Sequence, residues 1–241
     1  MTNKEFSDSF AVMLNSYAKK ASFGEQSSVA DIVLDEYEKS VFLTKAQEEV
    51  VINLYNGNNK LQKGFEETEE LRRYLDPLIE TVEERTEILV PKAVKLKSNS
   101  QFFELPSNLL FITLEQAKIK DESCEYTNTI TVVPTTQDSY SRIKNNPFKG
   151  PTKYRVLRLD YGNNIVELVP PKGKSISKYI IRYLRKPTPI VLEDFTSEGL
   201  YVGDRQKPSE CELNSILHST ILERAVYLAL QSRAVSSEKN N

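Results

Sequence analysis

The spacing of apolar residues changes twice along this chain, and these changes constrain the fold more than any other feature. Up to about residue 86, and again from Ser209, apolar residues recur at three- and four-residue intervals, which is typical of amphipathic helices. Between these regions, short runs of β-branched and aromatic residues alternate with Pro, Asn and Ser clusters, which is typical of strands. The pattern predicts an α+β fold, in which a helical bundle from the N-terminal helices and the C-terminal helix is interrupted by an antiparallel β-rich insertion. The expected domains are a helical part, residues 1–86 completed by 207–235, a β-rich insertion, residues 87–206, and a frayed tail, residues 236–241.

Capping signals predict where individual helices begin. Three pairs have capping-box spacing, and they are Thr2 with Glu5, Thr44 with Gln47, and Ser209 with Glu212. The second pair predicts two short helices joined at Phe42–Leu43. Residues 65–82 have the pattern of a further helix with an acidic first turn, which Pro77 would kink or split.

The middle of the chain contains turn and strand signals. Gly162-Asn163-Asn164 between two apolar runs predicts a β-hairpin. Residues 136–145 fit a short helix. Residues 178–184 predict a strand with Tyr179, Ile181 and Tyr183 on one face, and Pro187 and Pro189 after it favour a position at a sheet edge.

Charge is segregated along the chain, although the formal net charge is only −2. Residues 142–192 hold twelve Lys and Arg against two acids, whereas residues 31–90 hold fifteen acids against seven bases. One copy could therefore bind a polyanion, or bind the next copy of itself head to tail. The candidate DNA- or neighbour-facing bases are Lys172, Lys174, Lys178, Arg182, Arg185 and Lys186. The candidate acidic interface consists of Asp35, Glu36, Glu38, Glu66, Glu67, Glu69 and Glu70.

The sequence contains no catalytic or cofactor-binding motif. The single histidine, His218, falls toward the polar side of its helix, and we expect it at the surface or in an interface. Gly173-Lys174-Ser175 resembles the end of a P-loop, but Leu168 stands where that loop requires glycine.

The cysteines have no zinc-binding spacing, and no apolar run approaches the roughly 18 residues of a membrane span. We therefore expect no catalytic residue, metal, cofactor or membrane partner. A third hypothesis is a metal-dependent enzyme built on scattered carboxylates.

The basic segment also supports an alternative function. Tyrosines are interleaved with its Lys and Arg residues, a pattern that suits a nucleic-acid surface whose affinity falls with salt. Basic residues on exposed strands also serve to prevent unwanted pairing of sheet edges. The alternative is a soluble nucleic-acid-binding accessory protein that uses residues 142–186.

Three separated segments resemble structural proteins of crAss-like Bacteroides phages. They are Leu34–Val50 continued by Asn53–Asn56, then Tyr179–Val191, and finally Cys211–Ala229. The resemblance implies a non-enzymatic head-to-tail connector of the virion neck or tail, assembled in the host cytoplasm. It implies a homo-oligomeric ring, twelvefold in such phages, whose partners are the portal protein, neighbouring tail ring proteins and genomic DNA during ejection. It supplies no catalytic residue.

Overall fold

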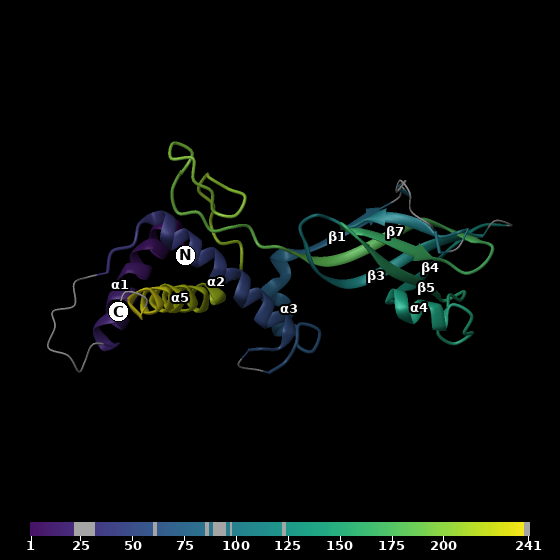
Figure 1. The fold of residues 1–241 in the computed structure, drawn as a ribbon, viewed down its shortest axis with the longest axis horizontal. Coiled ribbons are helices and arrows are strands. Elements are labelled where there is room, and N and C mark those ends of the chain that lie inside the picture. Colours follow the sequence, from purple (N-terminus) through teal and green to yellow (C-terminus); the bar gives the residue numbers. More distant parts are fainter. Residues whose placement is uncertain are drawn as a thin grey trace. The chain divides into compact units, whose positions relative to one another are not determined.

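The computed structural model describes residues 1–21, 32–59, 62–84, 87–88, 95–96, 98–121 and 124–238 (Figure 1). The chain forms two compact units. We call Met1–Leu78 with Pro187–Asn241 the helical unit, and Ile79–Lys186 the β unit. The described residues contain five α-helices and a seven-stranded sheet, so the predicted α+β class is confirmed.

The helical unit is built on three long helices. Its elements are α1 (Asn3–Ala21), α2 (Glu36–Asn56), α3 (Glu69–Leu75), the 3₁₀-helices η1 (Asp76–Leu78) and η2 (Ser215–Leu217), and α5 (His218–Glu238). α5 packs against both α1 and α2. Phe6 and Phe10 of α1, Leu43 of α2, and Ile221 and Ala225 of α5 are fully buried in this core.

α2 is one continuous helix where two short helices were predicted. It begins at a capping box in which the Asp35 side chain accepts from the Glu38 N–H and the Glu38 side chain accepts from the Asp35 N–H. It ends at Gly57, whose φ of +83° is the left-handed conformation that glycine adopts without a Cβ clash. Thr44 does not cap a helix, because its side chain lies mid-helix and bonds to the backbone of Ile190.

An extended segment, residues 188–192, runs along α2 in the helical unit, although it was expected in the β-rich insertion. Three α2 side chains at i, i+4 and i+7 hold it. The Gln47 amide donates to the Thr188 carbonyl over 2.8 Å, the Ile190 N–H donates to Thr44 over 3.1 Å, and the Leu192 N–H donates to Ser40 over 3.0 Å. These bonds satisfy a backbone that has no strand neighbour on that side.

The β unit is a curled sheet with the strand order β1-β7-β3-β4-β5-β6-β2. The strands are β1 (Ile79–Glu84), β2 (Gln101–Glu104), β3 (Leu109–Asp121), β4 (Cys124–Pro134), β5 (Arg155–Gly162), β6 (Ile165–Val169) and β7 (Lys174–Arg185). All pairs are antiparallel except β4 with β5, which is parallel. The β-rich part is therefore antiparallel as predicted, apart from this one parallel pair. The connection from β4 to β5 carries helix α4 (Gln137–Ile143), and such a crossover permits parallel pairing.

The edges of this sheet differ from the prediction. Strand β1 (Ile79–Glu84) includes the end of the helix predicted over residues 65–82, and it pairs along β7 from Ile79↔Leu184 to Glu84↔Tyr179. β7 therefore lies between β1 and β3 rather than at an edge. Pro187 and Pro189 follow the end of β7 and leave its ladder intact. Its Tyr179, Ile181 and Tyr183 are buried, as their shared face predicted.

Other local predictions have mixed outcomes. The hairpin is confirmed, and Gly162, Asn163 and Asn164 all have positive φ at the turn between β5 and β6. The Thr2–Glu5 capping box is confirmed, as is a short helix after Thr136.

The capping box predicted at Ser209 and Glu212 is wrong, because both side chains bond elsewhere. Ser209 donates to the Pro189 carbonyl and Glu212 accepts from the Thr188 N–H. Residues 236–238, expected in the frayed tail, belong to α5.

Candidate interface surfaces

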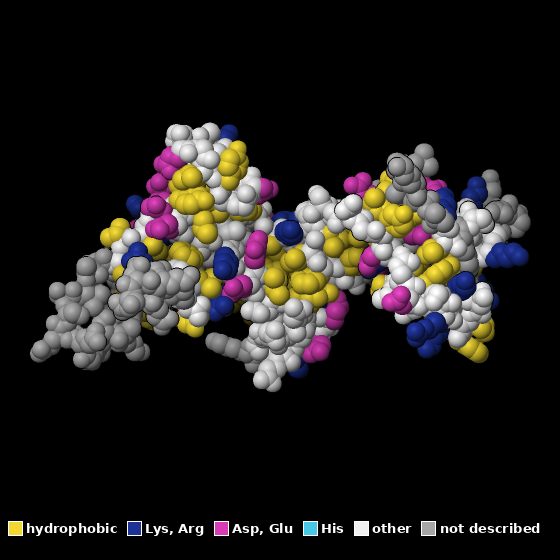
Figure 2. Space-filling view, viewed as in Figure 1, with side chains coloured by type: hydrophobic (Ala, Val, Ile, Leu, Met, Phe, Trp, Pro, Cys, Tyr) yellow, Lys and Arg dark blue, Asp and Glu magenta, His cyan; other side chains and the backbone are white. Residues whose placement is uncertain are grey.

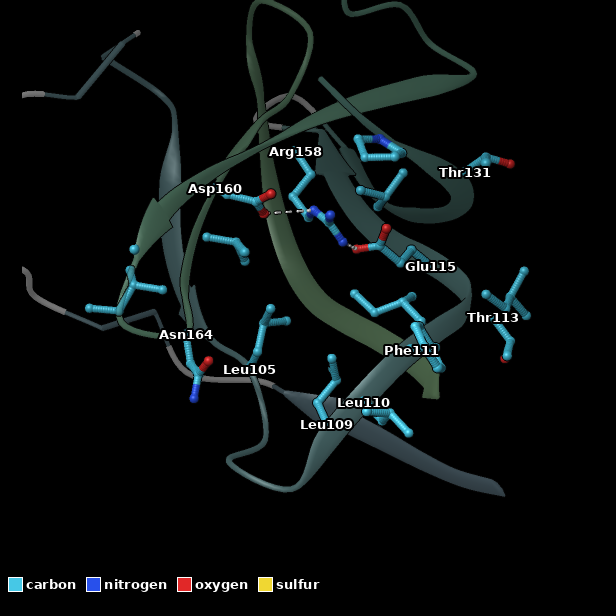
Figure 3. A pocket seen from close by; sticks show the side chains of 17 residues that line it. Leu105, Leu109, Leu110, Phe111, Thr113, Glu115, Thr131, Arg158, Asp160 and Asn164 are labelled. Atoms are coloured by element: carbon cyan, nitrogen blue, oxygen red, sulfur yellow. Dashed lines mark ion pairs between the residues drawn. The ribbon is translucent and has the colours of Figure 1, made fainter. Parts of the chain in front are cut away.

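The β unit contains an open groove of about 740 Å³, lined mostly by apolar residues (Figure 3). One wall is the first half of β3, and the other comes from the ends of β4 and β5 and the start of β6. The groove arises because β4 pairs with β3 only from Gln116 onward, while Leu109–Glu115 pair with β7 alone. Beyond that point β4 pairs with β5, so the sheet opens between β3 and β5. We call this the β3 groove.

The wall formed by β3 is apolar on both faces. Leu109 and Ile112 pack against the main core of the β unit. Leu110 and Leu114 also line the groove, and Leu114 is 44% exposed. A strand with one wet face alternates apolar and polar residues, so the run Leu109–Leu114 has more apolar surface than its own fold covers.

A charged network forms the polar part of the groove. Arg158 Nη1 lies 2.8 Å from Glu115 Oε1, and Arg158 Nε lies 3.3 Å from Asp160 Oδ1. The Tyr179 hydroxyl donates to Glu115 from the core side. Burial raises the pKa of Tyr179, and the Glu115 charge raises it further. Burial tends to lower the pKa of Arg158, but the Glu115 carboxylate outweighs it and the pKa is raised, so Arg158 stays ionised.

A second feature of the β unit is the projecting loop of residues 144–155, which we call the aromatic loop. Phe148 and Tyr154 are 83% and 70% exposed, and Lys144, Lys149 and Lys153 around them are exposed too. Figure 2 shows Lys and Arg side chains gathered at the end of the β unit that carries α4. The loop therefore offers two large apolar rings within a basic surface.

The aromatic loop is held in shape by its own hydrogen bonds. Asn146 Oδ1 accepts from the Phe148 N–H over 2.8 Å, and the Gly150 N–H donates to the Asn146 carbonyl over 2.7 Å. The Arg155 guanidinium donates to the Phe148 carbonyl over 2.7 Å. A Cβ at Gly150 would lie 2.7 Å from the Asn146 oxygen and 2.8 Å from the Ile143 oxygen, closer than such atoms approach. The exposed rings are thus presented by a fixed backbone.

The six predicted basic residues lie on β7 and on the turn before and after it. Lys172, Arg182 and Lys186 are exposed, and Lys174 is half-buried. Lys178 lies 3.1 Å from Glu83, and Arg185 lies 2.9 Å from Glu80. The acids of β1 thus offset part of the basic face, because β1 pairs along β7.

The seven predicted acidic residues fall into two groups in the helical unit. At the start of α2, Asp35 and Glu38 form the capping box, and Glu36 pairs with Lys39. Around the start of α3 the acids are exposed: Glu66 and Glu67 precede it, Glu69 lies 2.6 Å from Arg73, and Glu70 accepts from the Tyr74 hydroxyl. The first group therefore has structural roles, whereas the second remains accessible.

His218 is buried, not on a surface, with 6% of its area exposed. Its Nε2 lies 3.0 Å from the Leu213 carbonyl and its Nδ1 lies 2.7 Å from the N-terminal nitrogen. The ring also packs against Phe6. Burial lowers the pKa of His218, because the positively charged form loses its hydration.

Sequence reasoning missed both the β3 groove and the shape of the aromatic loop. A signal for the groove existed in Leu109–Leu114, where apolar residues occupy both faces of one strand. The described residues contain no group of three or more His, Cys, Asp or Glu side chains placed to hold a metal ion. In the same part of the chain, no helix is long and apolar enough to cross a membrane.

The sequence is similar to known proteins of one family along its whole length. A family model described as phage tail ring protein 3/4 matches residues 1–241. The chain belongs to this family. It is 46% identical to Ring protein 3 of Bacteroides phage crAss001 over 236 residues, which cover 97% of this chain and 96% of that protein. It is 33% identical to Ring protein 4/5 of the same phage over 235 residues, which cover 95% of this chain and 92% of that protein. The resemblance to ring proteins of crAss-like phages is thus confirmed, and the chain is a structural ring protein of the virion.

Proposed function

We propose that the protein forms a homo-oligomeric ring in the phage neck, which connects the portal to the next tail component around the DNA channel. The observation that carries this proposal is the match of the whole chain to a family of tail ring proteins. The relatives named as ring proteins match this chain over nearly their full lengths, so the likeness extends over both units.

The surfaces of the chain suit a cyclic assembly. A ring uses heterologous contacts, in which one surface of each copy meets a different surface of the next. In our proposal the helices α1, α2 and α5 form the bundle that builds the ring body, and the β unit, as an insertion in it, reaches a neighbouring copy or an adjacent ring. The exposed acids at Glu66, Glu67, Glu69 and Glu70 provide a surface for basic residues of a neighbour.

The proposed partners are the portal protein, neighbouring tail ring proteins and genomic DNA in transit, with twelvefold symmetry that follows the portal. On β7 and the turns that flank it, Lys172, Arg182 and Lys186 are the exposed candidates to face DNA. Because Lys178 and Arg185 pair with acids of β1, this face attracts DNA less strongly than its sequence suggests. A face on which some bases are exposed and others are paired with acids suits the wall of a channel, because DNA can pass along it without being bound tightly.

The proposal is tested by the mass and the image of the assembled protein. The full chain, purified alone and with its portal, is measured by mass photometry and cryo-electron microscopy. We expect a closed ring that joins the portal, with the β units in contact with neighbouring copies or rings. A persistent monomer that never joins the portal at high concentration contradicts the proposal.

The second candidate function is a soluble nucleic-acid-binding accessory protein, which the exposed bases of the β unit favour. It predicts DNA binding that weakens steeply with salt and is lost when Lys172, Lys174, Arg182 and Arg185 are neutralised together. A matched control neutralises four exposed lysines of the helical unit: Lys4, Lys45, Lys63 and Lys207. Equal DNA affinity for both variants removes this candidate.

A further inference from the structure

We propose that adjacent copies are joined by insertion of the aromatic loop of one β unit into the β3 groove of the next. This contact specifies the interface of the ring proposed above and rests on that proposal. Phe148 and Tyr154 would be the inserted side chains, and the partner is a second copy of this chain.

The β3 groove has the properties of an interface that another chain completes. β3 presents Leu109, Leu110, Ile112 and Leu114 to the groove, and of these Leu109 and Ile112 also pack against the core. Exposed apolar area of this kind marks interaction sites in soluble proteins. The volume of about 740 Å³ lies within the roughly 300–1,000 Å³ of pockets that hold a drug-sized molecule. It is therefore large enough for two aromatic side chains.

The aromatic loop has the properties of the occupant. Phe148 is 83% exposed, so it does not fill the groove of its own chain. Aromatic side chains dominate interface energetics, and each buries about 150–250 Å² when covered. Because Asn146, Gly150 and Arg155 fix the loop backbone, insertion orders little additional chain and costs little conformational entropy.

The charges of the two surfaces are complementary. The loop carries exposed Lys144, Lys149 and Lys153. In the groove, the single base Arg158 faces two carboxylates, Glu115 and Asp160, so one negative charge is in excess. An incoming lysine can pair with the exposed Asp160, and such complementarity also favours the correct orientation during association.

The loop and the groove form a heterologous pair. Each copy has one of each on the same compact unit, so each copy can donate to one neighbour and accept from the other. Repetition of a heterologous contact closes into a ring when its rotation permits. A two-fold dimer with reciprocal insertion would use the same two surfaces, and the measured mass of the assembly distinguishes that dimer from a ring.

The experiment uses two assembly-defective variants of the full chain. The loop variant is Phe148→Ala with Tyr154→Ala, and the groove variant is Leu110→Lys with Leu114→Lys. The matched control is Tyr201→Ala with Val12→Ala, two exposed apolar residues of the helical unit. Assembly is followed by mass photometry and analytical ultracentrifugation over a concentration series.

We expect the loop and groove variants each to assemble at least roughly 30-fold more weakly than the wild type, as truncation of an interface hot spot does. The control should assemble like the wild type. The mixture of the two variants should give one-to-one dimers, because only the loop of the groove variant and the groove of the loop variant remain intact. Neither variant alone should form these dimers.

Each alternative outcome has a distinct meaning. If the wild type forms rings and the loop variant forms them equally well, this contact is wrong while the proposed function stands. If the wild type never assembles, even with its portal, the proposed function fails and this contact with it. If the loop variant assembles normally but loses DNA affinity, the loop is a nucleic-acid surface and the proposed contact is overturned.

A further variant guards against misfolding of the groove variant. Gly150→Ala changes no exposed side chain, but its Cβ would clash with the Asn146 and Ile143 carbonyl oxygens and displace the loop. We expect it to weaken assembly with an unchanged circular dichroism spectrum. If Gly150→Ala and the loop variant both assemble as strongly as the wild type, the proposal is overturned. This conclusion does not depend on whether the groove variant folds.

Discussion

The helical unit and the β unit each contain a buried polar network, and the two networks are built from different groups. In the helical unit, the neutral side chains of Ser40, Thr44 and Gln47 bond to the backbone of residues 188–192. In the β unit, the charged side chains of Glu115 and Arg158 bond to each other beside the groove. The first network therefore joins neutral side chains to an irregular backbone segment, while the second is a buried ion pair beside the groove.

The two networks differ in the free energy that is lost when one partner is removed. A neutral hydrogen bond contributes little net stability, but its loss leaves a buried group unsatisfied at a cost of about 1–3 kcal/mol. Removal of one partner from a buried ion pair costs about 3–5 kcal/mol, because the remaining charge is left without compensation. The β unit should therefore be more sensitive to single charge deletions than the helical unit is to single polar deletions.

The largest effect is expected for Arg158→Met. This change leaves Glu115 buried without its cation, and we expect the free energy of unfolding of the β unit to fall by about 3–5 kcal/mol. Hydrogen exchange of β3 and β5 measures it locally. Addition of Glu115→Gln to Arg158→Met should restore much of the loss, since no unpaired charge remains. A change below about 1 kcal/mol in the single variant would show that water reaches this pair.

A smaller effect is expected for Gln47→Ala in the helical unit. Gln47 is fully buried, and its removal leaves the Thr188 carbonyl without its donor. We expect a loss of about 1–3 kcal/mol in the free energy of unfolding, with faster hydrogen exchange at Ile190 and Leu192. Glu48→Ala, at an exposed position on the same helix, is the matched control. Equal behaviour of the two variants would contradict the role assigned to Gln47.

The smallest effect is a change in stability with pH. We expect it in the helical unit alone, because His218 is the single histidine of the chain. The pKa of His218 in the fold lies below its usual 6.5, because burial disfavours imidazolium, so the unfolded chain binds the proton first. Neutral His218 therefore contributes to the free energy of unfolding. This contribution is fully present above about pH 6.5, the pKa of histidine in the unfolded chain, and it is lost as the pH falls through the lower pKa of His218 in the fold.

We therefore expect α5 to exchange its amide hydrogens faster at pH 5.5 than at pH 7.5, beyond the intrinsic pH effect. The β unit contains no histidine and should not respond in this window. His218→Gln should remove the difference in α5. A response of α5 that survives this substitution would assign the effect to other groups.

Sequence reasoning succeeded where a structure depends on residues that are close in the chain. The capping box at Thr2 and Glu5 and the turn at Gly162–Asn164 involve bonds and dihedral angles within a few residues. It failed at Thr44 and at Ser209, whose side chains bond to Ile190 and Pro189 instead of capping helices. The capping-box spacing at Thr44 and at Ser209 is the same as at Thr2. At Thr44 and Ser209 a backbone segment distant in sequence competes for the side chain, and at Thr2 no described segment does.

The candidate site shows the same division. The excess of Lys and Arg in residues 142–192 was visible in the sequence, but the pairing of Lys178 and Arg185 with β1 was not, since most of β1 was predicted to be helical. The groove also required the structure, because it exists only where β4 leaves β3 at Gln116. The apolar run Leu109–Leu114 indicated uncovered surface on β3, but no pattern within β3 or β4 alone reports where the two strands separate.

The sequence by itself determined the α+β class, the hairpin, the segregation of charge and the relation to ring proteins of crAss-like phages. These properties follow from residue order, because periodicity, turns and capping act over a few residues and family likeness is a property of the sequence. The tertiary structure alone decided that α2 is continuous, that β7 is internal, that His218 is buried, and that a groove and a projecting aromatic loop occur on one unit. These depend on contacts between residues up to 217 positions apart, as in the bond from Met1 to His218, and packing overrides local preference there.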